Sequence, residues 1–270
     1  MTTAAQGARE LIEAGIGSPE GFLTGAENAV RRLAGPADLD ALLAGLIRQG
    51  EEHPETVSVP ARLSDRHPLG FTKLVLLGEE PRYLLRAHLW DPPPDRRGPA
   101  APAAPERPPG RPEGAPRRGG PERPAAAGHI HNHRFALASR ILCGSLTMQV
   151  FAANPYAGGE GMVMSGYRES SSREEGRWRL ERTGPASVRQ TAQLCLPRGT
   201  GYALAAEVLH RVEPAPDGPT ATLFLQTALT RRGTEVYVPA GRPEPAPVRR
   251  RALSAREYLD ALRRLRTLVR

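Results

Sequence analysis

The stretch 128–134 reads Gly-His-Ile-His-Asn-His-Arg and carries three histidines at alternate positions. Residues two apart on a β-strand point to the same face, so a His-x-His pair delivers two imidazoles to one metal ion. Both His129/His131 and His131/His133 have this spacing. A third ligand from a distant antiparallel strand would complete a facial set with open positions opposite it, and His210 is the obvious donor. The alternative is a group of surface or hydrogen-bonded barrel histidines.

Strands must position these histidines, and much of the chain has the two-residue period of strands. Many short strands separated by Gly and Pro turns predict an all-β core, either a β-barrel or a double-sheet jelly roll. A turn or bulge is expected at 143–146, inside the segment 139–152. The predicted strands are 56–59, 70–77, 83–90, 139–152, 178–181, 188–196 and 220–228.

The strand 83–90 has two different faces. Leu85, Ala87 and Leu89 share one face, whereas the other face carries Leu84, Arg86, His88 and Trp90. We expect the second face to line a cavity because it carries polar groups. Arg86 and His88 are therefore candidate substrate-binding residues, although either could be an ordinary hydrogen-bonded barrel residue.

Helices are expected at both ends of the chain. Residues 1–55 are predicted to be helices packed on the barrel, and an apolar stripe at helical spacing supports this. The stripe consists of Leu39, Leu42, Leu43, Leu46 and Ile47. The barrel is expected at 56–240, followed by a basic tail and a capped C-terminal helix at 241–270. That helix is predicted to dock on the barrel; a basic interaction helix is the alternative.

A tract at 91–127 interrupts the strand pattern. It consists almost entirely of Pro, Ala, Gly, Arg and Glu, with no large apolar residue after Trp90 to offset the entropy of ordering it. We expect a disordered, partly polyproline insert between two strands of the barrel.

The basic charge of the chain lies outside the predicted barrel. The net charge is +8, while the segment 92–128 carries seven Arg against four acidic residues and 241–270 carries nine Arg against three. The rest of the chain is therefore close to neutral, which argues against a basic groove for nucleic acid on the barrel.

Two cysteines, Cys143 and Cys195, lie in apolar, strand-like contexts without paired spacing. This pattern indicates neither a disulfide framework nor a cysteine zinc site. The first residues have no apolar segment of signal-peptide length, and no apolar run approaches a membrane span. We therefore expect a cytoplasmic protein without a membrane partner.

Two parts of the chain resemble cupin motifs. The stretch 130–133, with a strand ending in Leu-Cys-Gly-Ser-Leu at 142–146, resembles the first motif. The turn at 197–202 and Leu-His-Arg-Val-Glu at 209–213 are similar to the second. More narrowly, the chain resembles the cysteine dioxygenase-like thiol dioxygenases, three-histidine iron cupins that oxidise small thiols with O₂. That family has a Tyr eight residues before the histidine of the second motif, as Tyr202 is here.

The resemblance covers roughly 56–228 and implies a double-stranded β-helix fold with an Fe(II) site. It implies His131, His133 and His210 as ligands, because the family's His-x-His lies close to the glycine of the first motif. The family also has a Tyr-Thr-Arg segment whose Arg holds the substrate carboxylate. Phe-Thr-Lys at 71–73 occupies the similar position, so Lys73 becomes a candidate substrate-binding residue, together with Tyr202.

Several residues depart from the family pattern. Leu137 stands near the place of the acidic residue of ordinary cupins, which suits a site of three histidines alone. On the last strand the family has Ser, His and Tyr spaced two apart, and Thr222, Phe224 and Gln226 stand there instead. Lys73 offers a point charge where an Arg would offer a bidentate fork. These departures leave open whether the substrate is cysteine.

The sequence thus predicts an Fe(II)-dependent dioxygenase that oxidises a small thiol or amino-acid-like anion with O₂, as a monomer or dimer. One alternative is an iron cupin that oxidises a non-thiol amino acid in specialised metabolism. Another is a non-catalytic cupin that binds a metal or ligand, with the arginine-rich tail contacting a partner.

Overall fold

The period of the apolar residues changes after the first sixty positions, and the fold changes with it from helices to strands. The computed structural model describes residues 2–17, 21–67, 70–91, 129–154, 161–172, 177–242, 248–249 and 251–270. The insert expected at 91–127 lies outside the described residues from position 92 onward. The helices are α1 (Thr3–Ile16), α2 (Phe22–Leu33), α3 (Pro36–Glu52), the 3₁₀ turn η1 (Pro54–Val57), α4 (Ser58–Leu63) and α5 (Ala255–Val269).

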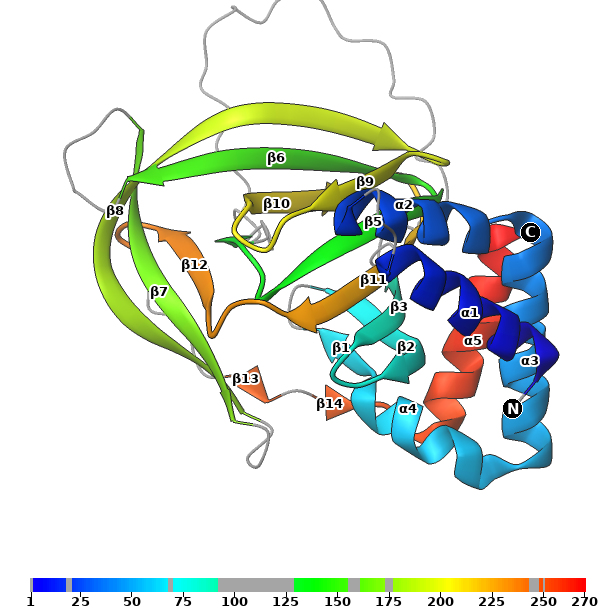
Figure 1. Ribbon diagram of the computed structural model, residues 1–270. Coiled ribbons are helices and arrows are strands. Elements are labelled where there is room, and N and C mark those ends of the chain that lie inside the picture. The colour runs from blue at the N-terminus through cyan, green and yellow to red at the C-terminus, as the bar shows by residue number, and fades with distance from the viewer. Residues whose placement is uncertain are drawn as a thin grey trace, which may run out of the picture.

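The described strands form two sheets that face each other (Figure 1). In spatial order the first sheet contains β14 (Arg251–Ala252), β1 (Asp65–His67), β2 (Phe71–Glu79), β3 (Tyr83–Trp90), β11 (Thr220–Leu229), β5 (Phe135–Cys143) and β9 (Gly201–Leu204). The second contains β13 (Val248–Arg249), β8 (Arg177–Pro197), β6 (Ser145–Asn154), β10 (Leu209–Pro214), β4 (Ile130–His131), β12 (Thr234–Pro239) and β7 (Met162–Ser172). Because β8 also pairs with β7, the second sheet closes on itself.

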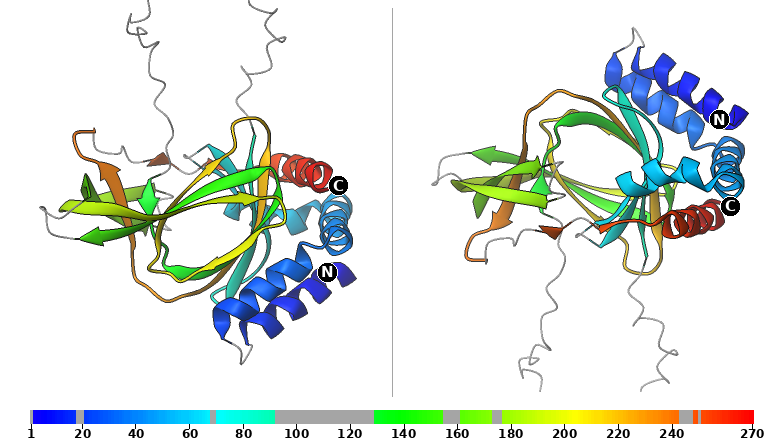
Figure 2. Two further views of the ribbon diagram at one scale, coloured as in Figure 1. Left: turned by 90° about the horizontal axis from the view of Figure 1, so that it is seen from above. Right: turned by 90° about the horizontal axis from the view of Figure 1, so that it is seen from below.

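Side chains on the first sheet alternate between two environments. Leu85, Ala87 and Leu89 of β3 belong to an apolar cluster that also contains buried residues of α1, α2, α3 and α5. We call it the helix-facing cluster. Figure 2 shows these helices gathered on one side of the strands. The opposite face points into the space between the two sheets, which we call the barrel interior. Trp90 and Ile141 of the first sheet pack there against Met148 of the second.

The all-β core with N-terminal helices and a C-terminal helix, predicted from the sequence, is confirmed. The turn expected at 143–146 is also present, since Gly144 separates β5 from β6 with a φ of 68°. A side chain there would meet the carbonyl of Pro219, so this position requires glycine. None of the described helices combines the length and the apolar character needed to cross a membrane.

Two local predictions are wrong. The strand expected at 56–59 is helical, because η1 and α4 continue the helical region as far as Leu63. Val57 is buried in the helix-facing cluster, so tertiary packing overrides the β-propensity of the Thr-Val pairs. The separate strands expected at 178–181 and 188–196 are parts of one long strand, β8, whose first half pairs with β7 and whose second half pairs with β6.

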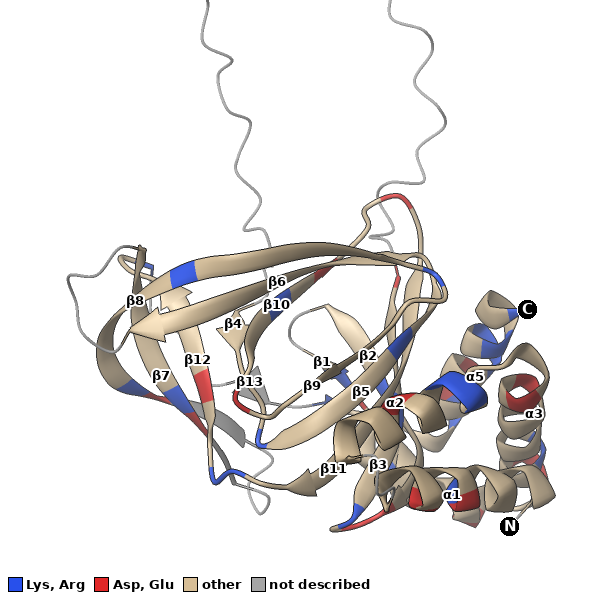
Figure 3. Ribbon diagram, turned by 45° about the horizontal axis from the view of Figure 1, so that its top comes forward, with Lys and Arg blue, Asp and Glu red and all other residues tan. Residues whose placement is uncertain are grey.

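The C-terminal helix docks on the protein as expected. Ser254 and Glu257 form a reciprocal capping box at its start, and Tyr258 reaches through the core to donate a 2.7 Å hydrogen bond to the carbonyl of Val75 in β2. Arg266 and Arg270 both pair with Asp40 of α3. Figure 3 shows acidic and basic residues interspersed on these helices, so this helix is not a uniformly basic surface.

Replacing Tyr258 by Phe should lower the free energy of unfolding by about 1–2 kcal/mol, because the buried carbonyl of Val75 loses its side-chain donor while the ring packing stays. Urea denaturation would measure the change. Thr267→Ala on the same helix removes only an exposed intrahelical bond and should change stability by less than about 0.5 kcal/mol. Equal effects of the two substitutions would contradict the role assigned to Tyr258.

Candidate metal centre

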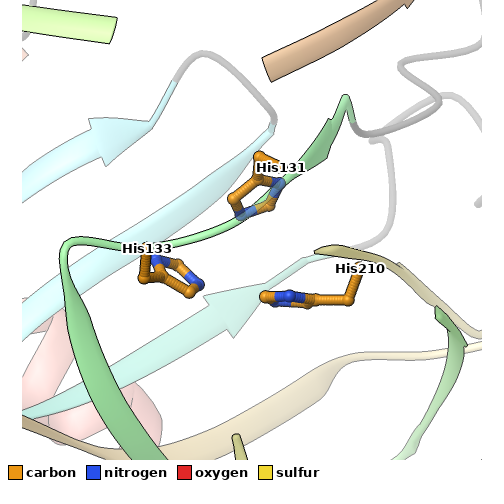
Figure 4. Close-up of side chains that lie close together, drawn as sticks. All are labelled: His131, His133 and His210. Atoms are coloured by element: carbon orange, nitrogen blue, oxygen red, sulfur yellow. The ribbon is translucent and has the colours of Figure 1, made fainter. Parts of the chain in front are cut away.

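Three histidines from distant parts of the chain meet in the barrel interior. His131 ends β4, His133 follows in the connection to β5, and His210 lies on β10 directly opposite His131. One ring nitrogen from each lies within 4.8 Å of those of the other two. Figure 4 shows the three rings turned toward a common point. The geometry of a three-coordinate imidazole site is therefore present.

The short strand β4 explains why both His131 and His133 aim at one point. Ile130 packs with Phe151 and Met164 in an apolar cluster of the second sheet. His131, the next residue of the strand, therefore faces the opposite way. The chain then leaves β4, and the backbone N–H of His133 donates to the carbonyl of Ala206 at 2.9 Å. This contact ties the connection to the loop before β10, close to His210.

Asn132 holds the two histidines of the His-x-His stretch in place. It is completely buried, its Nδ2 donates to Oε2 of Glu235 at 2.6 Å, and its Oδ1 accepts from the backbone N–H of Glu235 at 2.7 Å. The sequence gives no signal for this pair because the partners are 103 residues apart. Asn132 thereby fixes the path of the backbone between the two imidazoles.

Backbone carbonyls orient two of the rings. Nδ1 of His131 donates to the carbonyl of His129 at 2.8 Å, and Nδ1 of His210 donates to that of Val208 at 3.0 Å. A proton on Nδ1 leaves the lone pair on Nε2, which is the arrangement that metal-binding histidines commonly have. His129 therefore contributes a carbonyl, while its ring lies outside the three-histidine group.

The environment keeps all three imidazoles neutral. Burial lowers the pKa of His131 and His133, and it lowers the pKa of His210 to about 3. The positive charge of Lys73 adds to the lowering at His133. Neutral imidazole is the ligand form, and the group contains no carboxylate. The residues therefore fit a divalent transition metal that accepts nitrogen ligands, Fe(II) among them.

The first sheet brings two of the expected substrate-binding residues to this centre. Lys73 of β2 lies opposite His88 of β3, and the charge or polarity of both lowers the pKa of His133. Arg86 lies further along β3, with its guanidinium carbon 6.0 Å from the ring centroid of Phe135. Phe135 in turn stacks on His133 at 5.0 Å.

Tyr202 occupies a different place. It lies on β9 opposite Ser139 and packs against the interior cluster that contains Trp90, Ile141 and Met148. Burial raises its pKa, with the hydroxyl of Ser139 acting in the opposite direction. Its role in substrate binding stays a prediction.

Aromatic side chains that sequence reasoning did not assign to the site surround the histidines. Phe224 lies 6.2 Å from His133 and 4.7 Å from His88, measured between ring centroids. Phe135 stacks on His133 at 5.0 Å and also lies 6.3 Å from Phe224, so the two phenyl rings are neighbours beside this imidazole. Strand alternation places Phe224 in the interior, but only the fold shows that it contacts a histidine of the His-x-His stretch.

Comparison with known proteins gives only remote likenesses. No protein-family model and no curated protein match the chain. Among solved structures, the chain is similar to hydroquinone 1,2-dioxygenase PnpCD in complex with Cd²⁺ and 4-hydroxybenzonitrile, with a TM-score of 0.30 and 11% identity over 58% of this chain and 63% of that one.

Two further structures show the same level of similarity. Hydroxypropylphosphonic acid epoxidase from S. wedmorenis in complex with fosfomycin gives a TM-score of 0.29 and 12% identity over 62% of this chain and 55% of that one. A cupin superfamily protein from Desulfitobacterium hafniense DCB-2 gives 0.26 and 7% over 58% and 77%. The chain spans between half and two thirds of the length of the dioxygenase and the epoxidase. Likenesses at this level carry no argument about function.

The metal-free protein should lose stability as the pH falls below neutrality. His210 titrates near 6.5 in the unfolded chain and near 3 in the folded protein, so between these values only the unfolded chain binds the proton. The free energy of unfolding is therefore unaffected by this group above pH 6.5, and it is lower by about 2 kcal/mol at pH 5. Urea denaturation at pH 7 and pH 5 would measure this.

The variant His210→Gln should show a smaller loss between these two pH values, whereas His53→Gln on the exposed surface should behave like the wild type. If the free energy of unfolding of His210→Gln depends on pH as strongly as that of the wild type, protonation of His210 does not cause the loss of stability.

Replacing Asn132 by Ala should lower the affinity for Fe(II) or Zn(II) by about 10–100-fold, because the imidazoles lose the side chain that fixes the backbone between them. Titration against a chelator of known affinity would measure the change. Gln149→Ala is the matched control, since it removes an amide that bonds Arg211 and Gln193 instead of the His-x-His backbone. Affinity of Asn132→Ala within about twofold of the wild type would contradict this role.

Proposed function

We propose that the protein is a mononuclear non-haem Fe(II) dioxygenase of the cupin type that oxidises a small anionic thiol with O₂. The observation that carries the proposal is the convergence of three neutral imidazoles, one buried and two half-buried, whose ligand nitrogens lie within 4.8 Å of one another. Three ligands on one side leave positions open on the other for a substrate and a gas molecule.

The charge of the ligand set supports an anionic substrate. Neutral imidazoles leave a bound divalent ion its full double charge, which favours direct binding of a thiolate or carboxylate. Lys73, close enough to lower the pKa of both His88 and His133, adds a positive charge on the same side. In this proposal Lys73 holds the second anionic group of the substrate and thereby orients it.

The proposed reaction is R–SH + O₂ → R–SO₂H, in which both oxygen atoms of O₂ are transferred to sulfur. Sulfur is oxidised by four electrons and O₂ is reduced by the same four, so the reaction requires no further reductant. Fe(II) would supply the site where the thiolate and O₂ meet and through which these electrons pass. Phe135 and Phe224 lie beside His133 and would present an apolar surface to the substrate on that side of the centre.

A second candidate is the oxidation of a non-thiol amino acid or a similar anion at the same iron. The observation that favours it is Phe224, which lies beside His133. The thiol dioxygenases that the chain resembles have a histidine at this position, between a serine and a tyrosine. Measurement of O₂ uptake by iron-loaded protein with thiols and with non-thiol amino acids distinguishes the two reactions. It also tests the non-catalytic alternative, which predicts no uptake with any substrate.

Replacing His131 by Ala should reduce bound iron from about one ion per chain to a small fraction and lower thiol-dependent O₂ uptake by about 100-fold or more, because one of three ligands is lost. Iron analysis and an oxygen electrode would measure both. His129→Ala is the matched control, since its backbone carbonyl remains and its ring lies outside the group. Unchanged iron content and O₂ uptake in His131→Ala would overturn the proposal.

A further inference from the structure

The inner face of β11 lies beside the candidate metal centre. Ala221, Leu223 and Leu225 belong to the helix-facing cluster, so the alternate residues Thr222, Phe224 and Gln226 face the barrel interior. The contact of Phe224 with His133 confirms this direction. Thr222 and Gln226 flank Phe224 at two residues on either side, about 7 Å from it along the strand.

Two buried polar atoms on facing residues have no hydrogen-bond partner among the described residues: Oγ1 of Thr222 on β11 and Nε2 of His88 on β3. Thr222 is only 1% exposed, and it lies directly opposite His88 in the pairing of β3 with β11. Buried polar groups are almost always paired in folded proteins, because an unmade hydrogen bond is expensive. Such exceptions gather where a ligand supplies the missing partner.

The subsite formed by these groups has no charge of its own. His88 is neutral because burial, with the charges of Lys73 and Arg86, holds its pKa well below the usual value. Phe71, Trp90 and Phe224 surround its ring. A neutral, aromatic-lined site can bind an uncharged polar group at little cost, whereas an ion would lose its hydration without compensation.

Cationic residues flank the subsite, with Lys73 on β2 opposite His88 and Arg86 two residues from His88 on β3. The pairing of β1, β2, β3 and β11 places Asp65, Lys73, His88 and Thr222 in one row across the sheet. Asp65 therefore lies two strands away from His88, with Lys73 between them. An ammonium group bound beside Thr222 would face the cations Lys73 and Arg86 before it reached this carboxylate.

We propose that Thr222 and His88 form a hydrogen-bonding subsite for an uncharged hydroxyl group of the substrate, whose thiolate lies at the metal centre and whose carboxylate lies toward Lys73. This inference rests on the proposed function and deepens it by naming the substrate class as small hydroxylated mercapto acids instead of amino acids. The hydroxyl of Thr222 can donate or accept, and Nε2 of His88 supplies the second partner.

Three compounds with one skeleton test the substrate class. 3-Mercaptopropionate, 3-mercaptolactate and L-cysteine carry hydrogen, hydroxyl and ammonium at the same carbon. Calorimetry on Zn(II)-loaded protein measures their binding without turnover, because Zn(II) has no redox chemistry. We expect 3-mercaptolactate to bind about tenfold more tightly than either of the others. Equal or tighter binding of L-cysteine, or no binding of 3-mercaptolactate, overturns the inference.

Two threonines of β11 provide matched variants. Thr222→Val should abolish the preference for the hydroxyl compound and leave the thermal midpoint unchanged or higher, because the hydroxyl that it removes has no partner. Thr227→Val should keep the preference and lower the midpoint, because the hydroxyl of Thr227 donates to the carbonyl of Ala136 at 2.7 Å. A preference that survives in Thr222→Val, or a midpoint lowered there as in Thr227→Val, contradicts the subsite.

The two proposals fail in different ways. Iron-loaded protein that consumes no O₂ with any thiol, together with a hydroxyl preference in the Zn(II) form, would reject the oxygenase and keep the subsite. Thiol oxidation without any hydroxyl preference would reject the subsite and keep the oxygenase.

Discussion

The pairing of β4 with β10 is the constraint on which the candidate site depends. Its register sets His210 opposite His131, and the strand alternation of Ile130 and His131 decides which side chain enters the apolar cluster of the second sheet and which enters the interior. A slip of one residue would exchange these faces and remove an imidazole from the centre. Since β4 has only two residues, the register must be held from outside, and the bonds between Asn132 and Glu235 of β12 do this.

This arrangement of the site lowers the stability of the fold. Three imidazoles are held in their neutral form with much of their surface removed from water, and several polar atoms beside them lack partners in the described structure. Each such feature opposes folding. The helix-facing cluster offsets this cost on the other side of the first sheet, where it buries side chains of five α-helices against the strands. A separate apolar core allows the interior to be polar around the metal centre without loss of the fold.

Much of this organisation follows from the sequence because it depends on local periodicity. The alternation in 83–90 correctly separates the helix-facing residues from the interior ones, and the capping residues of the last helix predict its start at Ser254. The His-x-His spacing leaves two candidate pairs open, and the resemblance to three-histidine cupins selects His131, His133 and His210, which the structure brings together. Residues 56–63 are helical against their β-propensity because the buried position of Val57 is set by tertiary packing. The Asn132–Glu235 pair likewise depends on contacts between distant segments, which no local pattern records.

The two sheets contribute different residues to the proposed site. The histidines come from β4, β10 and the connection between β4 and β5, whereas Lys73, His88 and Phe224 come from the first sheet. Side chains on the first sheet can therefore change without moving the imidazoles. Thr222, Phe224 and Gln226 differ from the pattern of the thiol dioxygenases, while the three histidines agree with it. Under the proposed function, a site divided in this way would keep the metal ligands in one sheet and the residues that select the substrate in the other, and the inner face of β11 would contribute to that selection.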